Sequence, residues 1–118
     1  MNVQRGDVAM VKFPFADGRT TKVRPAVVVQ NDRNNQRLDN VILVQVTSRL
    51  GPPNELTRFV IDPKTAEGAL SGLSLVSVVS CENLVTVQKD RILKVTGHLA
   101  EADQRRLDAS LKASLSLD

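Results

Sequence analysis

Short apolar stretches rich in Val, Ile and Leu recur along the chain, and polar or turn-forming residues separate them. β-Branched residues favour extended backbone, and short strands at regular spacing are typical of small barrels and sandwiches. The pattern therefore predicts a mainly β domain of about six strands, arranged most simply as a small barrel. These strands are expected at residues 7–13, 25–30, 41–47, 57–62, 73–81 and 91–97.

The segments between these strands carry turn signals. Asp17-Gly18 marks the first turn, and Gly-Pro-Pro at residues 51–53 interrupts the chain between the third and fourth strands. The polar stretch 31–40 is expected to be a loop or a short irregular helix. Residues 63–72 are expected to form a flexible crossing, and residues 87–90 a short linker.

A different period begins at Ala100. Leu107, Leu111 and Leu115 recur every four residues with charged residues between them, which predicts one amphipathic helix. Ala100 is a weak N-cap, because Ser or Asp at that position would accept a hydrogen bond from the first turn. We therefore expect the helix to be stabilised by packing its leucines onto the sheet.

The chain length of 118 residues suits one domain, spanning residues 1–118, that hides roughly two-thirds of its unfolded surface. Cys81 is the only cysteine, which excludes an internal disulfide, and residues 1–10 lack the apolar run of a signal peptide. No stretch approaches the ~20 apolar residues of a membrane span. We expect a soluble, cytoplasmic protein without a membrane partner. Its net charge of +3 and pI near 9.4 suggest a polyanionic partner.

The residue inventory excludes several kinds of chemistry. One cysteine and one histidine provide no local cluster for zinc and no Cys-His nucleophile pair. Nucleotide-binding glycine loops and kinase motifs are absent from the sequence. His98 is expected to have a capping or surface role, and Cys81 to be a small buried hydrophobe. We therefore expect no metal and no cofactor.

Five short motifs occur in a fixed order along the chain. They are "RGDV" at 5–8, "RPAVVVQND" at 24–32, "VTS" at 46–48, the "SCEN" to "DRI" stretch at 80–92, and "GHL" at 97–99. As an ordered set they resemble the MazF/PemK family, the ribosome-independent messenger-RNA endoribonucleases of bacterial toxin-antitoxin pairs. The resemblance implies an SH3-like β-barrel with a C-terminal helix, assembled as a homodimer. It also implies cleavage of single-stranded RNA without metal, leaving a 2′,3′-cyclic phosphate and a 5′-hydroxyl.

The resemblance also implies catalytic residues. The family's catalytic arginine and threonine fall on Arg24 and Thr47, and a carboxylate that assists in some members falls on Glu82. Arginine suits a transferring phosphate, because its permanently charged, planar guanidinium can bind two phosphate oxygens at once. Because its guanidinium is already protonated at neutral pH, Arg24 would be a poor general base. Glu82 is therefore the expected base.

Other residues are expected to contact RNA. Two departures from the family pattern, Thr57-Arg58 in place of Thr-His and a first loop that differs from those of other members, leave the cleaved sequence open. The expected partners are single-stranded RNA, a second copy of the chain, and an antitoxin with an acidic, partly apolar flexible segment. DNA binding by the toxin-antitoxin complex is a further possibility that the resemblance raises. The expected RNA-binding residues are Phe15, Arg19, Lys22, Ser48, Arg49, Arg58 and Asn83.

Two other functions are compatible with the same fold. One is a catalytically silent RNA-binding barrel, which only a cleavage assay separates from a nuclease. The other is a gyrase-poisoning toxin. That relative relies on a C-terminal tryptophan, whereas this chain has no tryptophan and ends in Leu-Asp.

Overall fold

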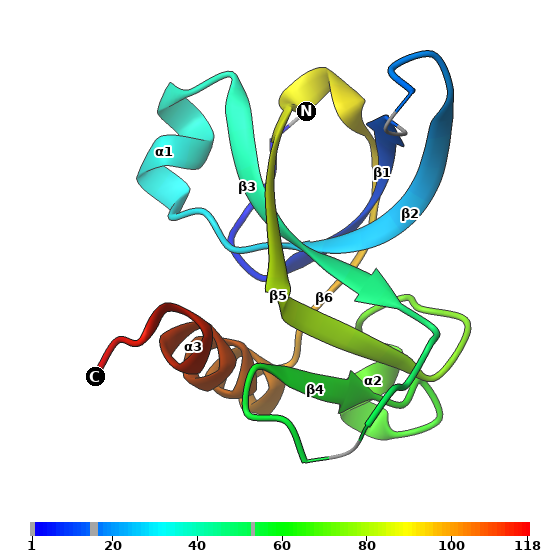
Figure 1. The fold of residues 1–118 in the computed structure, drawn as a ribbon, viewed down its shortest axis with the longest axis vertical. Coiled ribbons are helices and arrows are strands. Elements are labelled where there is room, and N and C mark those ends of the chain that lie inside the picture. The colour runs from blue at the N-terminus through cyan, green and yellow to red at the C-terminus, as the bar shows by residue number, and fades with distance from the viewer. Residues whose placement is uncertain (1, 15–16, 53) are drawn as a thin grey trace.

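Six antiparallel strands form one bent sheet in the computed structural model, which describes residues 2–14, 17–52 and 54–118 (Figure 1). The hydrogen-bonded strand order is β4-β5-β3-β2-β1-β6. Among the described residues no ladder joins β4 to β6, so the expected mainly β fold is confirmed, with an open sheet instead of a closed barrel. The strands are β1 (Asp7–Pro14), β2 (Thr21–Val28), β3 (Asn40–Thr47), β4 (Arg58–Ile61), β5 (Ser77–Gln88) and β6 (Ile92–His98).

Both faces of this sheet are buried. Along β1, Val8 and Ala9 point to opposite faces, as successive strand residues do, and they belong to different core clusters. Val27 and Val28 in β2 divide in the same way. One cluster lies inside the curl of the sheet that Figure 1 shows, and the other includes Leu107 of the C-terminal helix. Burial on both faces explains why the strands have nearly continuous apolar sequences.

Strand β2 begins four residues earlier than the sequence predicted. Its exposed first half, from Thr21 to Arg24, pairs with residues 11–14 of β1. Strand β3 pairs with β2 only from Ala26 onward. Pro25, which lacks an N–H group, therefore lies where β2 has a β1 partner but no paired β3 residue.

Strand β5 begins four residues later and ends seven residues later than expected, so only residues 89–90 of the predicted linker at 87–90 connect two strands. The strand runs to Gln88, and the short 3-10 turn η1 (Lys89–Arg91) follows it. Its pairing with β3 shifts register, because Val44 pairs with Leu84 while the next residue pairs with Ser80. This bulge contains the polar residues 82–83, which interrupt the apolar alternation that predicts a strand.

Three helices complete the fold. Helix α1 (Asp32–Arg37) occupies the segment for which a loop or short helix was expected, and the Asn31 side chain caps it by accepting from the backbone N of Asn34. Helix α2 (Ala66–Ala69), capped by Thr65, lies in the segment expected to be a flexible crossing, so that prediction was wrong. With four residues, α2 is too short to give a detectable helical period.

Helix α3 (Glu101–Leu115) is the predicted amphipathic helix, and as expected Ala100 provides no side-chain cap. Leu107 is fully buried and Leu111 packs on the same core, but Leu115 is about half exposed. Four residues turn a helix by about 400°, so leucines at this spacing drift around the helix by about 40° per step. Ser114 replaces Leu115 on the inner face, where its hydroxyl donates to the backbone oxygen of Cys81 over 2.7 Å.

The different burial of these leucines gives a stability prediction. Leu107→Ala should lower the free energy of unfolding by about 2–5 kcal/mol, because it leaves a cavity between α3 and the sheet. Leu115→Ala, the matched control, should change it by less than about 0.5 kcal/mol. Urea unfolding followed by circular dichroism measures both. Equal losses in the two variants would contradict this packing of α3.

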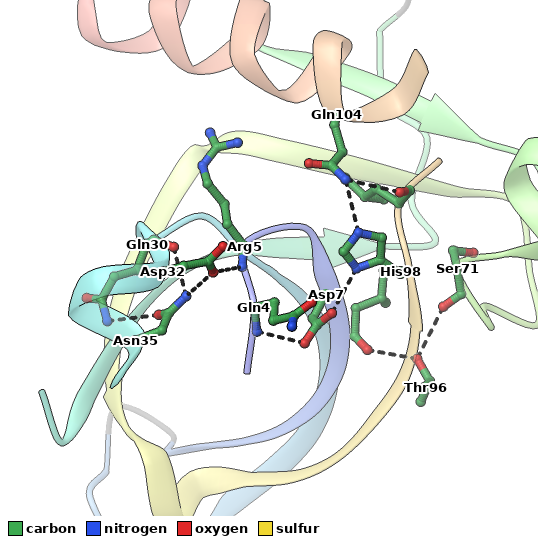
Figure 2. Close-up of polar contacts among 12 residues, drawn as sticks. Gln4, Arg5, Asp7, Gln30, Asp32, Asn35, Ser71, Thr96, His98 and Gln104 are labelled. Carbon is green, nitrogen blue, oxygen red and sulfur yellow. Dashed lines mark hydrogen bonds and ion pairs between the residues drawn. The ribbon is translucent and has the colours of Figure 1, made fainter. Parts of the chain in front are cut away.

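A polar junction fastens the N-terminal end of α3 to the sheet (Figure 2). His98 lies between Asp7 and Gln104, with Nδ1 2.8 Å from the Asp7 carboxylate and Nε2 3.0 Å from the Gln104 amide nitrogen. Arg5 adds a second link, because its side chain donates to the backbone oxygen of Val29 and pairs with Asp108 of α3. Both ring nitrogens of His98 are engaged, which agrees with a structural role.

Candidate functional site

Arg24 and Thr47 lie together where β2 and β3 diverge. The β2–β3 ladder pairs Ala26 with Gln45, and extending this antiparallel register by two residues sets Arg24 opposite Thr47. Both residues line the same two surface clefts. The sheet register thus brings together two residues that are 23 positions apart in the sequence.

The first cleft has a volume of about 210 Å³ and a largely apolar wall. Met10 and Pro25 come from the β1–β2 pair, and Leu73 and Leu75 come from the segment before β5. The sequence did not predict this wall, because it joins parts of the chain that carry no common motif. Its remaining residues are Arg24, Val46, Thr47, Ser48, Gly72, Ser74, Ser77 and Thr96.

The second cleft is polar and basic, with a volume of about 540 Å³. Its cations are Lys22, Arg24 and Arg49, and among the described residues none of the three forms an ion pair with a carboxylate. Three unneutralised cations around one cleft produce a positive potential that attracts anions. The other residues of this cleft are Gln45, Val46, Thr47 and Ser48.

The Thr47 hydroxyl has a defined orientation. Its oxygen accepts a hydrogen bond of 3.1 Å from the backbone N of Arg49. Because the oxygen acts as acceptor in this contact, the hydroxyl hydrogen remains available to donate to an anion in the cleft. Arg24 and Thr47 can therefore both donate to the same phosphate group.

Glu82 lies elsewhere. It belongs to the β5 bulge, where its Oε2 accepts a 2.5 Å hydrogen bond from the Thr57 hydroxyl and lies 3.1 Å from Nε of Arg58. Neither Glu82 nor Arg58 lines either of the clefts formed by Arg24 and Thr47. The structure thus brings together two of the three expected catalytic residues, and it pairs the third with an expected RNA contact.

Some of the other expected RNA contacts line the basic cleft, and others lie outside it. Lys22, Ser48 and Arg49 line the basic cleft. Arg19 is exposed in the first loop, where its backbone N donates to Asp17, and the Asn83 amide donates to Ser80; neither lines these clefts. Phe15 lies outside the described residues.

Other chemistry has little support in the described parts of the chain. Within residues 2–14, 17–52 and 54–118, no group of three or more His, Cys, Asp and Glu side chains could hold a metal ion. Cys81 is fully buried, as expected, and burial raises the pKa of its thiol to about 11, which leaves little of the reactive thiolate at neutral pH. None of the described helices has the length and apolar character of a membrane span.

The sequence model of the PemK-like, MazF-like toxins of type II toxin-antitoxin systems matches residues 4–115. This chain belongs to that family. A relative in Bacillus subtilis (strain 168), endoribonuclease EndoA, is 30% identical over 118 residues, which are 99% of this chain and 97% of the relative. The match confirms the family indicated by the ordered motifs, and it agrees with the endoribonuclease class expected from them.

Solved structures share the fold of this PemK/MazF-like toxin. A mycobacterial endoribonuclease in complex with its cognate antitoxin superposes with a TM-score of 0.77 at 20% identity, covering 98% of this chain and 97% of that chain. The MazE-MazF complex of Deinococcus radiodurans superposes with a TM-score of 0.75 at 18% identity, covering 100% of this chain and 99% of that chain. The Mycobacterium tuberculosis toxin MazF-mt6 has a TM-score of 0.71 at 22% identity, covering 93% of this chain and 98% of that chain. At these identities, the comparison establishes the fold.

Proposed function

We propose that this PemK/MazF-like toxin is a ribosome-independent, sequence-selective endoribonuclease that cuts single-stranded messenger RNA without a metal ion. The principal support is the convergence of Arg24 and Thr47 on a basic cleft whose cations have no carboxylate partners among the described residues. The endoribonuclease name of the Bacillus relative adds to it. The products are a 2′,3′-cyclic phosphate and a 5′-hydroxyl.

In the proposed reaction, the 2′-oxygen of a ribose attacks the adjacent phosphorus, and the bond from phosphorus to the 5′-oxygen of the next nucleotide breaks. The Arg24 guanidinium binds two non-bridging oxygens and stabilises the extra negative charge of the pentacoordinate transition state. Arg24 also donates a proton to the leaving 5′-oxygen and recovers one from solvent. Thr47 donates a hydrogen bond to a phosphate oxygen. This contact holds the phosphate in line with the attacking 2′-oxygen.

The 2′-hydroxyl must lose its proton during this step. The residues that line the two clefts include no carboxylate and no imidazole, and Arg24 is a poor base because its guanidinium is already protonated. Glu82, the base expected from the sequence, is paired with Thr57 and Arg58 outside the clefts. We therefore assign the acceptor role to a water molecule, which is consistent with a slow nuclease.

A metal-independent mechanism predicts that cleavage survives chelation. Purified protein should cut single-stranded RNA equally well in EDTA and in magnesium, because the proposed charge stabilisation comes from Arg24 and Thr47 and not from a metal ion. Duplex RNA of the same sequence should resist, since its riboses cannot place the 2′-oxygen in line with the leaving oxygen. A gel assay that also identifies the end groups measures both. Loss of cleavage in EDTA, or 5′-phosphate ends, would rule out this mechanism.

We further propose that the toxin acts as a homodimer. Leu75 of the apolar cleft is 62% exposed, and Leu70 and Val95, which line the neighbouring cleft, are 59% and 39% exposed. Thr96 lines both clefts, so these side chains lie around one continuous surface beside the site. Exposed apolar surface of this kind is typical of protein-protein contacts, and a second copy of the chain is the partner that we assign to it.

The cognate antitoxin should silence the enzyme by occupying the basic cleft with an acidic segment that orders on binding. Inhibition should therefore weaken a few-fold in Lys22→Ala and Arg49→Ala, and association should slow as salt rises. Arg105→Ala is the matched control, because Arg105 lies on α3 in an exposed pair with Glu101. We expect a neighbouring gene to encode the antitoxin. Titration of that antitoxin at two salt concentrations, in binding and cleavage assays, tests this prediction. Inhibition that is equally strong in all three variants would show that the antitoxin binds elsewhere.

A further inference from the structure

We propose that Arg58 is a positioning residue: anchored by Glu82, it supports the loop between β3 and β4 and so orients the Thr47 hydroxyl. This inference rests on the proposed nuclease function, and it gives Glu82 and Arg58 a single shared role. The relevant contacts run from the β5 bulge, through Arg58 and Gly51, to the backbone that binds Thr47.

The anchor is a compact polar cluster at the start of β4. Nε of Arg58 lies 3.1 Å from Oε2 of Glu82, and the same oxygen accepts the Thr57 hydroxyl at 2.5 Å. The Arg58 Nε atom is buried, and its N–H does not point along a hydrogen bond, so the attraction to Glu82 is that of an ion pair. Breaking this pair while Nε stays buried would leave an uncompensated charge, which favours the observed position of the guanidinium.

The far end of the same guanidinium reaches the loop. A Cβ atom built on Gly51 would lie 2.7 Å from Nη1 of Arg58, so the guanidinium packs directly against the Gly51 backbone. Gly51 has a φ of +64°, a conformation that favours glycine. The planar group thus spans the Glu82 carboxylate and the loop backbone, which a lysine ammonium could not do.

The loop in turn controls the site. Ser48 and Arg49 follow β3 directly and line the basic cleft, two residues before Gly51. The backbone N of Arg49 donates to Oγ1 of Thr47, and this contact holds the oxygen in place while its hydrogen stays free to donate. If Gly51 moves, Arg49 moves with it, and the Thr47 oxygen loses its donor.

These contacts favour positioning over the two direct roles expected from the sequence. Arg58 lines neither cleft, and its guanidinium already contacts the Glu82 carboxylate and the Gly51 backbone. Glu82 also lies outside both clefts, where its Oε2 accepts from Thr57 and pairs with Arg58. The observed contacts therefore link both groups to the loop and leave neither of them in a cleft.

The main experiment measures kcat/KM for RNA cleavage in Arg58→Ala, Thr47→Ala and the double variant. Arg58→Ala should lower kcat/KM by about 10- to 100-fold, the size of effect that a misplaced catalytic group produces. In the Thr47→Ala background, Arg58→Ala should lower kcat/KM by less than about twofold, because the hydroxyl that Arg58 orients is absent. Arg58→Lys should recover only a minor part of the loss. Glu82→Gln should resemble Arg58→Ala in rate and keep the wild-type dependence on pH.

Gly51→Ala tests the loop end of the contact. It should lower kcat/KM as much as Arg58→Ala does, because the added Cβ displaces the guanidinium. In the Arg58→Ala background it should cause little further loss of kcat/KM. Gly18→Ala is the matched control for backbone strain, since Gly18 has a φ of +71° and no atom within 4 Å of an added Cβ. Thermal unfolding of every variant establishes that the loss of activity is not a loss of fold.

The outcomes separate this inference from the proposed function. If Arg58→Ala lowers kcat/KM as much in the Thr47→Ala background as in the wild-type protein, the positioning role is overturned. Loss of the acid limb of the pH profile in Glu82→Gln, with that limb intact in Arg58→Ala, would overturn it in favour of a base. Amide hydrogen exchange at Arg49 needs no RNA: it should accelerate at least about tenfold in Arg58→Ala, and unchanged exchange would overturn the inference even if the protein proved not to be a nuclease. Failure of Arg24→Ala to reduce cleavage would instead remove the proposed site.

Discussion

Arg24→Ala is expected to lower kcat/KM for RNA cleavage by at least about a thousandfold. In the proposed mechanism the substitution removes the charge that stabilises the transition state, for which a loss of about 10²–10³-fold is typical. It also removes the proposed proton donor for the leaving oxygen. Arg24 lines both clefts and has no carboxylate partner in the described parts of the chain, so its loss should not disturb another contact. Single-turnover cleavage of a short fluorescent RNA measures the effect.

Arg24→Lys provides the matched control for charge. A lysine keeps the positive charge but binds as a point charge, without the planar pair of N–H groups that fits two phosphate oxygens. We therefore expect it to recover less than about a tenth of the wild-type rate. Because Arg24 is exposed, both variants should keep the wild-type melting temperature. Near wild-type cleavage by a folded Arg24→Ala protein would show that the site lies elsewhere.

Thr47→Ala should have the next largest effect, a loss of about 100-fold in kcat. In the proposed mechanism the hydroxyl is one of two donors to the phosphate, and removing one preorganised donor typically costs this much. Thr47→Ser retains the hydroxyl and should keep most of the activity. Thr47→Val retains the shape and the β-branched backbone preference but removes the hydroxyl, so it should be as slow as the alanine variant.

Binding measurements distinguish this role from simple RNA affinity. An RNA with a 2′-deoxyribose at the cleaved position cannot react, and its dissociation constant should change by less than about threefold in Thr47→Ala, because the basic cations supply most of the attraction. A loss of binding that accounts for the whole loss of rate would make Thr47 a binding residue instead of a catalytic one.

Much of the fold could be predicted because local sequence controls it. The β-branched runs identified the six strands, and the leucine period identified α3. The end of β5 could not be found in this way, because the polar residues Glu82 and Asn83 occupy a bulge that is held by its neighbours on β3 and β4. Helix α2 was missed for a related reason: its single turn is stabilised by the Thr65 cap and by close packing of Gly68 on Asp62.

The candidate site was predictable to a similar degree. The family motifs identified Arg24 and Thr47, and the sheet register explains why these two residues meet. The apolar wall of the first cleft could not be predicted, because Leu73 and Leu75 reach Met10 only through the tertiary fold. The position of Glu82 also depends on tertiary contacts, since its partners Thr57 and Arg58 lie 24 and more residues before it.

The most direct test of the account is a map of new 5′ ends on one long messenger RNA, prepared in EDTA with wild-type protein and with Arg24→Ala. We predict that wild-type protein produces discrete 5′-hydroxyl ends that share one short sequence and fall in single-stranded regions. The same ends should be absent with Arg24→Ala. An identical set of ends from the two proteins, or no ends from wild-type protein, would contradict the assignment of this cleft as a ribonuclease site.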